Sequence, residues 1–145
     1  KRPELSLDVA LEDGMPLPIQ SEIGLIHIQG AASIGEFAFF HQPSKTLVLT
    51  DLVFNIRKPQ GLMAHLMLWM VGCHGKLGQS RIWRFAVKDR QSFARSLCDV
   101  LALNCERLIV AHGEVILEDA NVPLHAVFEP SARQTKLALE SSNRS

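Results

Sequence analysis

The chain has 145 residues, 47% of them hydrophobic, which is enough for one domain with a buried core. Fifteen basic and fifteen acidic residues give zero net charge, so the composition argues against nucleic acid or an anionic membrane as a partner. The three cysteines are odd in number and form no CxxC pair, so we expect neither a disulfide framework nor a zinc knuckle, and a cytoplasmic location.

Two further stretches bear on membranes. The start, KRPELSLDVALEDG, lacks the apolar stretch of a signal peptide. The most apolar window, residues 62–71, is too short to span a bilayer. We therefore expect no membrane segment.

The first part of the chain predicts strands. A proline- and glycine-bearing segment, residues 1–22, is expected to be extended or a loop. Apolar, β-branched and aromatic runs then predict three strands, the last two joined in a hairpin by HQPSK: Ile23–Ile28, Glu36–Phe40 and Thr46–Thr50.

The second part is mainly helical. Residues 62–71 (LMAHLMLWMV) have helical composition, and Ser80 is a candidate N-cap for a short helix over RIWRFAV. Asp89 is a candidate N-cap for the helix DRQSFARSLCDVLAL, whose apolar residues recur at helical spacing on one face: Phe93, Leu97, Val100 and Leu101.

The chain closes with one more strand and a helix. Arg107–Val110 (RLIV) predicts a short buried strand, and the following residues to about Leu139 predict a helix interrupted at Pro130. The order of elements predicts an α/β layered domain over residues 1–140, with a polar tail at 141–145.

Two polar residues follow buried strands. TLVLT runs into Asp51, and RLIV runs into His112, which a glycine follows. Polar groups at the carboxyl ends of buried strands face a common rim where ligands bind in layered α/β proteins. A carboxylate and an imidazole are ligands for zinc, iron or manganese. Glu114 is a weaker candidate, whose carboxylate could accept a hydrogen bond from the His112 ring and so orient it.

A purely structural interpretation stays open for both residues. Asp51 could cap the segment after it by accepting backbone N–H bonds, and His112 could be a hydrogen-bonded histidine at a strand end. The remaining histidines are expected at turns or on helix surfaces. The LMAHLMLWM segment either packs onto the sheet or covers a ligand or partner surface. The arginines and lysines of residues 81–95 predict a solvated face.

Three blocks resemble an uncharacterised family within the metallo-β-lactamase-fold superfamily. They are HQPSKTLVLTDLVFNIRKP (41–59), GKLGQSRIWRFAVKDRQSFARSL (75–97) and RLIVAHGEVI (107–116). The resemblance implies the second half of an αββα sandwich. It also implies that Asp51 bridges two metals and that His112 binds one of them, with an activated water as the nucleophile.

Three positions depart from the superfamily pattern. The histidine-rich HxHxDH motif does not occur in these 145 residues, and the loop that often carries a further histidine reads GAASIGE (30–36). Thr50, not glycine, precedes Asp51. Two ligands are too few for a catalytic zinc site, which takes three protein ligands and an open position.

The sequence thus supports two functional hypotheses. One is a metallo-hydrolase-like protein with one or two zinc, iron or manganese ions, hydrolysing an ester-, amide- or phosphodiester-type bond of a small-molecule substrate. The other is a non-catalytic binding module with a degenerate metal site. Half a sandwich would expose an apolar sheet face, so we expect a homo-oligomer or association with a missing N-terminal half.

Overall fold

The computed structural model describes residues 22–58, 61–63, 65, 69, 72, 73, 75–79 and 81–130. The predicted N-terminal loop, apart from Glu22, lies outside these residues, as do Ser80, His74 and the polar tail. Within the described part, no helix is long and apolar enough to cross a membrane.

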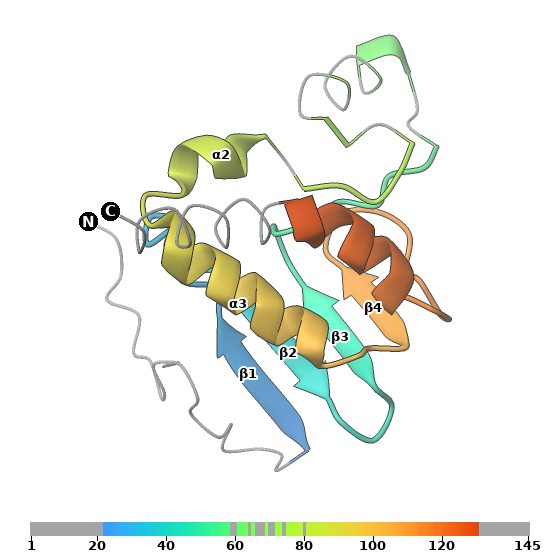
Figure 1. Ribbon diagram of the computed structural model, residues 1–145. Coiled ribbons are helices and arrows are strands. Elements are labelled where there is room, and N and C mark those ends of the chain that lie inside the picture. Colours follow the sequence, from blue (N-terminus) through green and yellow to red (C-terminus); the bar gives the residue numbers. More distant parts are fainter. Residues whose placement is uncertain are drawn as a thin grey trace, which may run out of the picture.

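One four-stranded sheet forms the centre, in the order β1-β2-β3-β4 (Figure 1). β1 pairs with β2 and β2 with β3 in antiparallel fashion, whereas β3 pairs with β4 in parallel. The strands are β1 (Ile23–His27), β2 (Phe37–His41), β3 (Thr46–Leu49) and β4 (Arg107–Val110). The predicted strands and the β2–β3 hairpin are therefore confirmed, with ends shifted by no more than one residue.

The helices differ in length and in how they begin. α2 (Ile82–Ala86) starts after Arg81, which makes no side-chain cap bond. α3 (Arg90–Ala102) is capped as predicted, because the Asp89 carboxylate accepts hydrogen bonds from the backbone N–H groups of Gln91 and Ser92. Hydrogen bonds from Ser92 lower the pKa of the Asp89 carboxyl. A last helix is described over residues 121–130.

The main core lies between the sheet and two helices. Figure 1 shows α3 and the helix 121–130 in front of the sheet, on the same face. The predicted apolar face of α3 is buried, and Leu124 and Phe128 of the last helix join the same core. The sheet contributes alternate residues, as a sheet with one covered face should: Ala38, Phe40, Leu47, Leu49, Leu108 and Val110. The α/β layered prediction is confirmed.

The opposite face of the sheet carries an apolar row across all four strands. The strand register aligns Leu25, Phe39, Val48 and Ile109. Exposure changes along this row: Leu25 is buried, whereas Ile109 is 43% exposed. An exposed part of this face agrees with the expectation for half a sandwich, and association through it stays a prediction.

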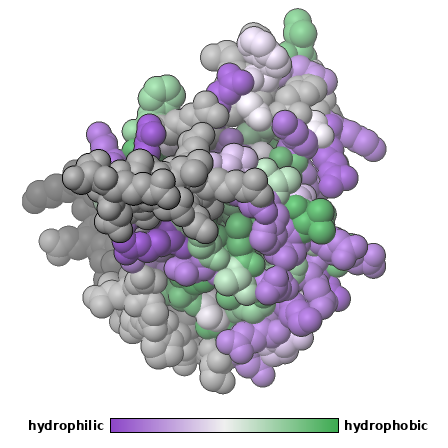
Figure 2. Space-filling view, in the orientation of Figure 1, coloured by the Kyte–Doolittle hydropathy of each residue, from purple (hydrophilic) through white to green (hydrophobic). Residues whose placement is uncertain are grey.

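The LMAHLMLWM segment does not pack onto the sheet where it is described. Leu62, Met63 and Trp69 are 87%, 71% and 69% exposed. Figure 1 shows this green segment at the upper right, beyond the strand ends, and Figure 2 shows a hydrophobic group protruding at the top of the molecule. The interpretation of this segment as core packing is therefore wrong for these three side chains.

Candidate functional site: a carboxylate–imidazole pair at the strand ends

The register of β3 and β4 brings the two predicted site residues together. Leu49 pairs with Val110 in the parallel ladder, and the chain continues for two residues from each strand to Asp51 and His112. Asp51 Oδ1 lies 2.9 Å from His112 Nε2, within hydrogen-bond distance. The two residues are thus neighbours across the rim, as the sequence predicts, and the parallel pairing is the reason.

The pair faces solvent. The Asp51 side chain is 59% exposed and that of His112 is 49% exposed. In the part of the chain that the structure describes, the Asp51 carboxylate hydrogen-bonds to this imidazole rather than to a backbone N–H group. The capping interpretation of Asp51 is therefore not the observed arrangement. A solvent-facing pair of this kind is accessible to a ligand or an ion.

The backbone around Asp51 is held by two buried groups. The Glu36 carboxylate is 4% exposed and accepts hydrogen bonds from the Thr50 and Asp51 N–H groups, at 2.9 and 3.3 Å, and from the Thr50 hydroxyl. On the other side, Trp83 Nε1 donates to the Asp51 carbonyl at 2.8 Å. Charge-assisted hydrogen bonds of the Glu36 type are stronger than neutral ones. Asp51 is therefore exposed at its carboxylate but fixed at its backbone.

The imidazole of His112 is positioned by packing. Its ring stacks on Phe54, with centroids 4.9 Å apart and planes 8° from parallel. The His112 carbonyl accepts a hydrogen bond from the N–H of buried Asn55 at 2.9 Å. Gly113 has a φ of +123°, and a Cβ there would lie 2.3 Å from the Asn55 carbonyl carbon. The chain can cross so closely only because residue 113 is glycine.

Glu114 does not orient His112 through its carboxylate. Its backbone is used instead: its N–H donates to the Asn55 carbonyl at 2.9 Å, and its carbonyl accepts from Asn55 Nδ2 at 2.6 Å. Among the described residues no hydrogen bond joins the Glu114 carboxylate to His112. The structure gives the orienting role to Phe54 instead.

Sequence reasoning missed Glu36, Phe54, Asn55 and Trp83. Phe54 and Trp83 look like ordinary members of apolar runs, and Glu36 looks like an exposed first residue of a predicted strand. Asn55 carried a usable signal, since an amide inside LVFNI costs free energy unless its hydrogen bonds are satisfied.

The described residues do not complete a catalytic metal site. Among them no group of three or more His, Cys, Asp or Glu side chains could hold an ion. Asp51 and His112 suit a metal by ligand chemistry, but they are two, and a catalytic zinc takes three protein ligands. Asp51 and His112 alone would therefore not hold a catalytic zinc ion.

The cysteines do not supply a nucleophile in this region. Cys73 and Cys105 are buried, and burial raises the pKa of both thiols, that of Cys105 to about 11. A raised pKa disfavours the thiolate, which is the reactive form. These two cysteines thus behave as packing residues.

Two solved structures resemble the chain. One is a metallo-beta-lactamase family protein from Thermus thermophilus, with a TM-score of 0.49 and 17% identity over 94% of this chain. The other is the DIM-1 metallo-beta-lactamase, with a TM-score of 0.42 and 15% identity over 83% of this chain. The chain spans only 38% and 44% of their lengths.

No protein-family model matches the chain, and no curated protein matches it. Similarity at this level assigns no activity to the chain. Any functional assignment therefore rests on the geometry of the pair.

Proposed function

We propose that the protein is metallo-hydrolase-like, and that Asp51 and His112 are two ligands of a divalent metal site whose other ligands lie outside the described residues. Zinc is the first candidate, with iron or manganese next, because carboxylate and imidazole ligands suit all three. A metal bound there would supply a water with a pKa lowered to about 7 for attack on an ester-, amide- or phosphodiester-type bond of a small molecule.

The observation that carries this proposal is the spacing of the two ligand atoms. Ligand atoms about 2.0–2.1 Å from a tetrahedral zinc lie roughly 3.3 Å from each other. Asp51 Oδ1 and His112 Nε2 lie 2.9 Å apart, so a shift of a few tenths of an ångström would let both contact one ion. Their exposure leaves room for further ligands from the solvent side.

This chain's own residues would limit how far the pair can move. The buried Glu36 carboxylate and the Trp83 indole hold the Asp51 backbone, and Phe54 sets the plane of the His112 ring. Such support from residues behind the ligands is typical of metal sites and of other sites that need fixed geometry.

The test is the metal content of the intact protein, purified without chelator, with and without substitutions at the pair. We expect Asp51→Asn and His112→Ala to lose at least one equivalent of bound metal, measured by inductively coupled plasma mass spectrometry. His125 and Glu129 offer a matched control, because they form another exposed imidazole–carboxylate pair, 3.3 Å apart. His125→Ala and Glu129→Gln should keep the metal.

A second candidate function follows from the hydrogen bond itself. Asp51 and His112 already satisfy each other at 2.9 Å, as a structural pair in a non-catalytic binding module would. Exposed Leu62, Met63 and Trp69 would then offer an adaptable apolar surface. An intact protein without zinc, iron or manganese, unchanged by either substitution at the pair, would favour this function over the metal site.

A further inference from the structure

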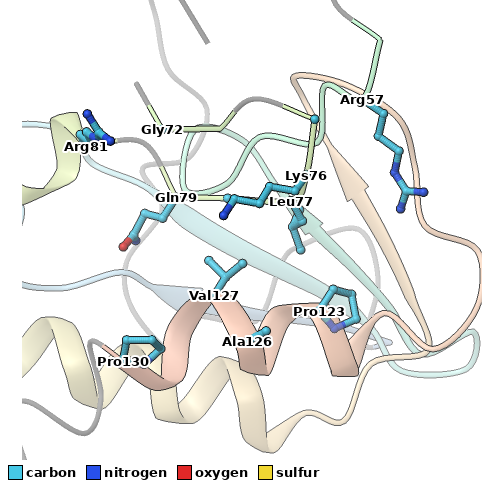
Figure 3. A pocket seen from close by; sticks show the side chains of 12 residues that line it. Arg57, Gly72, Lys76, Leu77, Gln79, Arg81, Pro123, Ala126, Val127 and Pro130 are labelled. Carbon is cyan, nitrogen blue, oxygen red and sulfur yellow. The ribbon is translucent and has the colours of Figure 1, made fainter. Parts of the chain in front are cut away.

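A cavity of about 710 Å³ lies apart from the Asp51–His112 pair, neither member of which lines it. Figure 3 shows it between the loop that carries Gly72, Lys76 and Gln79 and the helix 121–130, with Arg57 at one end and Arg81 near the other. Its volume falls within the range of roughly 300–1,000 Å³ typical of small-molecule sites.

Among the described residues that line this cavity, the charged side chains are all basic: Arg57, Lys76 and Arg81. The chain as a whole has zero net charge, so the excess is local. Burial raises the pKa of the nearby Cys73 thiol, while the charges of Lys76 and Arg81 act to lower it. Both cations therefore act on one region, where an anion would be attracted.

A hydrogen-bond donor without a partner lies in the same lining. Gln79 Nε2 is closed to solvent and has no hydrogen-bond partner among the described residues. An unsatisfied buried amide costs free energy, and a small rotation of the Gln79 side chain toward the cavity would let it donate to an acceptor there. In Figure 3 the side chains of Lys76 and Gln79 extend into the space that faces the helix. At one end of the cavity, Arg57 Nε donates a hydrogen bond to Asn55 Oδ1 at 3.4 Å, which positions the Arg57 side chain.

The facing wall is apolar. The helix presents Pro123, Ala126, Val127 and Pro130 to the cavity, and Leu77 adds to them from the loop. A ligand that matches both walls would have an oxyanion at one side and a hydrocarbon body at the other. A free inorganic anion would use only the basic wall, and a neutral hydrocarbon only the apolar one.

We propose that this cavity binds a small amphiphilic oxyanion, a carboxylate or phosphate monoester with an apolar body, through Arg57, Lys76, Arg81 and the Gln79 amide. This proposal does not depend on a metal at Asp51 and His112.

Isothermal titration calorimetry of the intact protein in EDTA tests the proposal with four probes. Octanoate and octyl phosphate carry both features, whereas 1-octanol lacks the charge and inorganic phosphate lacks the tail. We expect at least one of the first two to bind about tenfold or more tightly than both of the others, and to weaken as salt is added. The stronger of the two identifies the head group. Equal affinity for octanoate, octyl phosphate and 1-octanol would overturn the proposal.

Substitutions locate the binding. Lys76→Met should weaken the better probe about ten- to a hundredfold, because it removes a charge-assisted hydrogen bond. Gln79→Glu should weaken it similarly, because the new carboxylate would repel the head group. Lys88→Met, at an exposed lysine outside the lining, is the control and should leave affinity unchanged. Equal affinities of the Lys76→Met, Gln79→Glu and Lys88→Met variants would place the binding elsewhere and refute the assignment.

Discussion

Two hydrogen-bonded imidazole–carboxylate pairs in the described part of the chain are built in different ways. His125 and Glu129 are four residues apart on one helix, and such a pair forms wherever a helix forms. Asp51 and His112 are 61 residues apart and meet only because β3 and β4 pair in parallel. Buried groups hold the backbone of the second pair. The comparison indicates that geometry fixed by long-range contacts, more than residue type, distinguishes a candidate site from a surface ion pair.

The largest expected effect is at Gly113. The backbone passes close to Asn55 at this residue, next to His112 of the strand-end pair, whereas the helical pair has no such crossing beside it. Gly113→Ala should destabilise the protein by about 3 kcal/mol or more, because the new Cβ would overlap the Asn55 carbonyl. Gly35→Ala is the control: its φ of +65° is also positive, but nothing lies within 4 Å. It should cost about 1 kcal/mol. Urea unfolding measures both, and equal costs would contradict the crossing argument.

Substitution of Glu36 tests whether the buried hydrogen bonds behind Asp51 stabilise the strand-end pair more than anything stabilises the helical pair. Glu36→Gln should cost about 2 kcal/mol, because the buried carboxylate accepts three hydrogen bonds that an amide cannot all satisfy. Glu129→Gln makes the same chemical change in the helical pair and should cost less than about 0.5 kcal/mol. Chemical denaturation of both variants gives the difference. A cost for Glu36→Gln as small as that for Glu129→Gln would show that Asp51 needs no such support.

Double-mutant cycles compare the pairs directly. Both are exposed, so we expect coupling free energies below about 1 kcal/mol for each. Asp51 with His112 should be the larger of the two, because their atoms lie 2.9 Å apart against 3.3 Å in the helical pair, and stacking on Phe54 already restricts the His112 ring. Thermal unfolding of single and double variants to Ala measures both couplings. A larger coupling for His125 with Glu129 would reverse the ranking.

The smallest expected effect is on the rate of thiol labelling. This rate reports how often the segment around Cys73 and Gly78, which pairs with Phe54 beside His112, opens to solvent. Cys73 is buried, and its Sγ donates to the Gly78 carbonyl at 3.4 Å, next to the backbone pairing of Gly78 with Phe54. Its raised pKa means fewer thiolates at pH 8, so its alkylation should be slow and should accelerate as the pH rises above 9. Exposed Cys98 on α3 should react first.

Mass spectrometry after timed iodoacetamide treatment distinguishes these thiols. Gly113→Ala should accelerate labelling at Cys73 but not at Cys98, if the close crossing keeps the segment shut. Equal labelling rates of Cys73 and Cys98 in the unmodified protein would show that this segment is open without any substitution.

Much of the fold could be predicted from local sequence, and little of the site's support could be. The apolar spacing and the Asp89 cap of α3, and the turn between β2 and β3, depend on neighbours within a few residues. The contact of Asp51 with His112 could be predicted in outline, since both follow buried strands. The role of Glu36 could not, because it depends on the exact register of the β2–β3 hairpin, which places Glu36 opposite Asp51 just beyond the paired residues. The exposure of Leu62 and Trp69 could not be predicted either, because hydrophobic side chains are expected to be buried.

The parallel pairing of β3 with β4 also has a kinetic consequence. In the sequence, α2, α3 and the long connection after Asp51 lie between these two strands. The chain must therefore close a large loop before any β3–β4 contact forms. Contacts between residues far apart in sequence slow folding. A pair that exists only after this closure, with its two residues 61 positions apart in the sequence, forms late. Binding at Asp51 and His112 would therefore report that the domain has finished folding, whereas His125 and Glu129 could meet as soon as their helix forms.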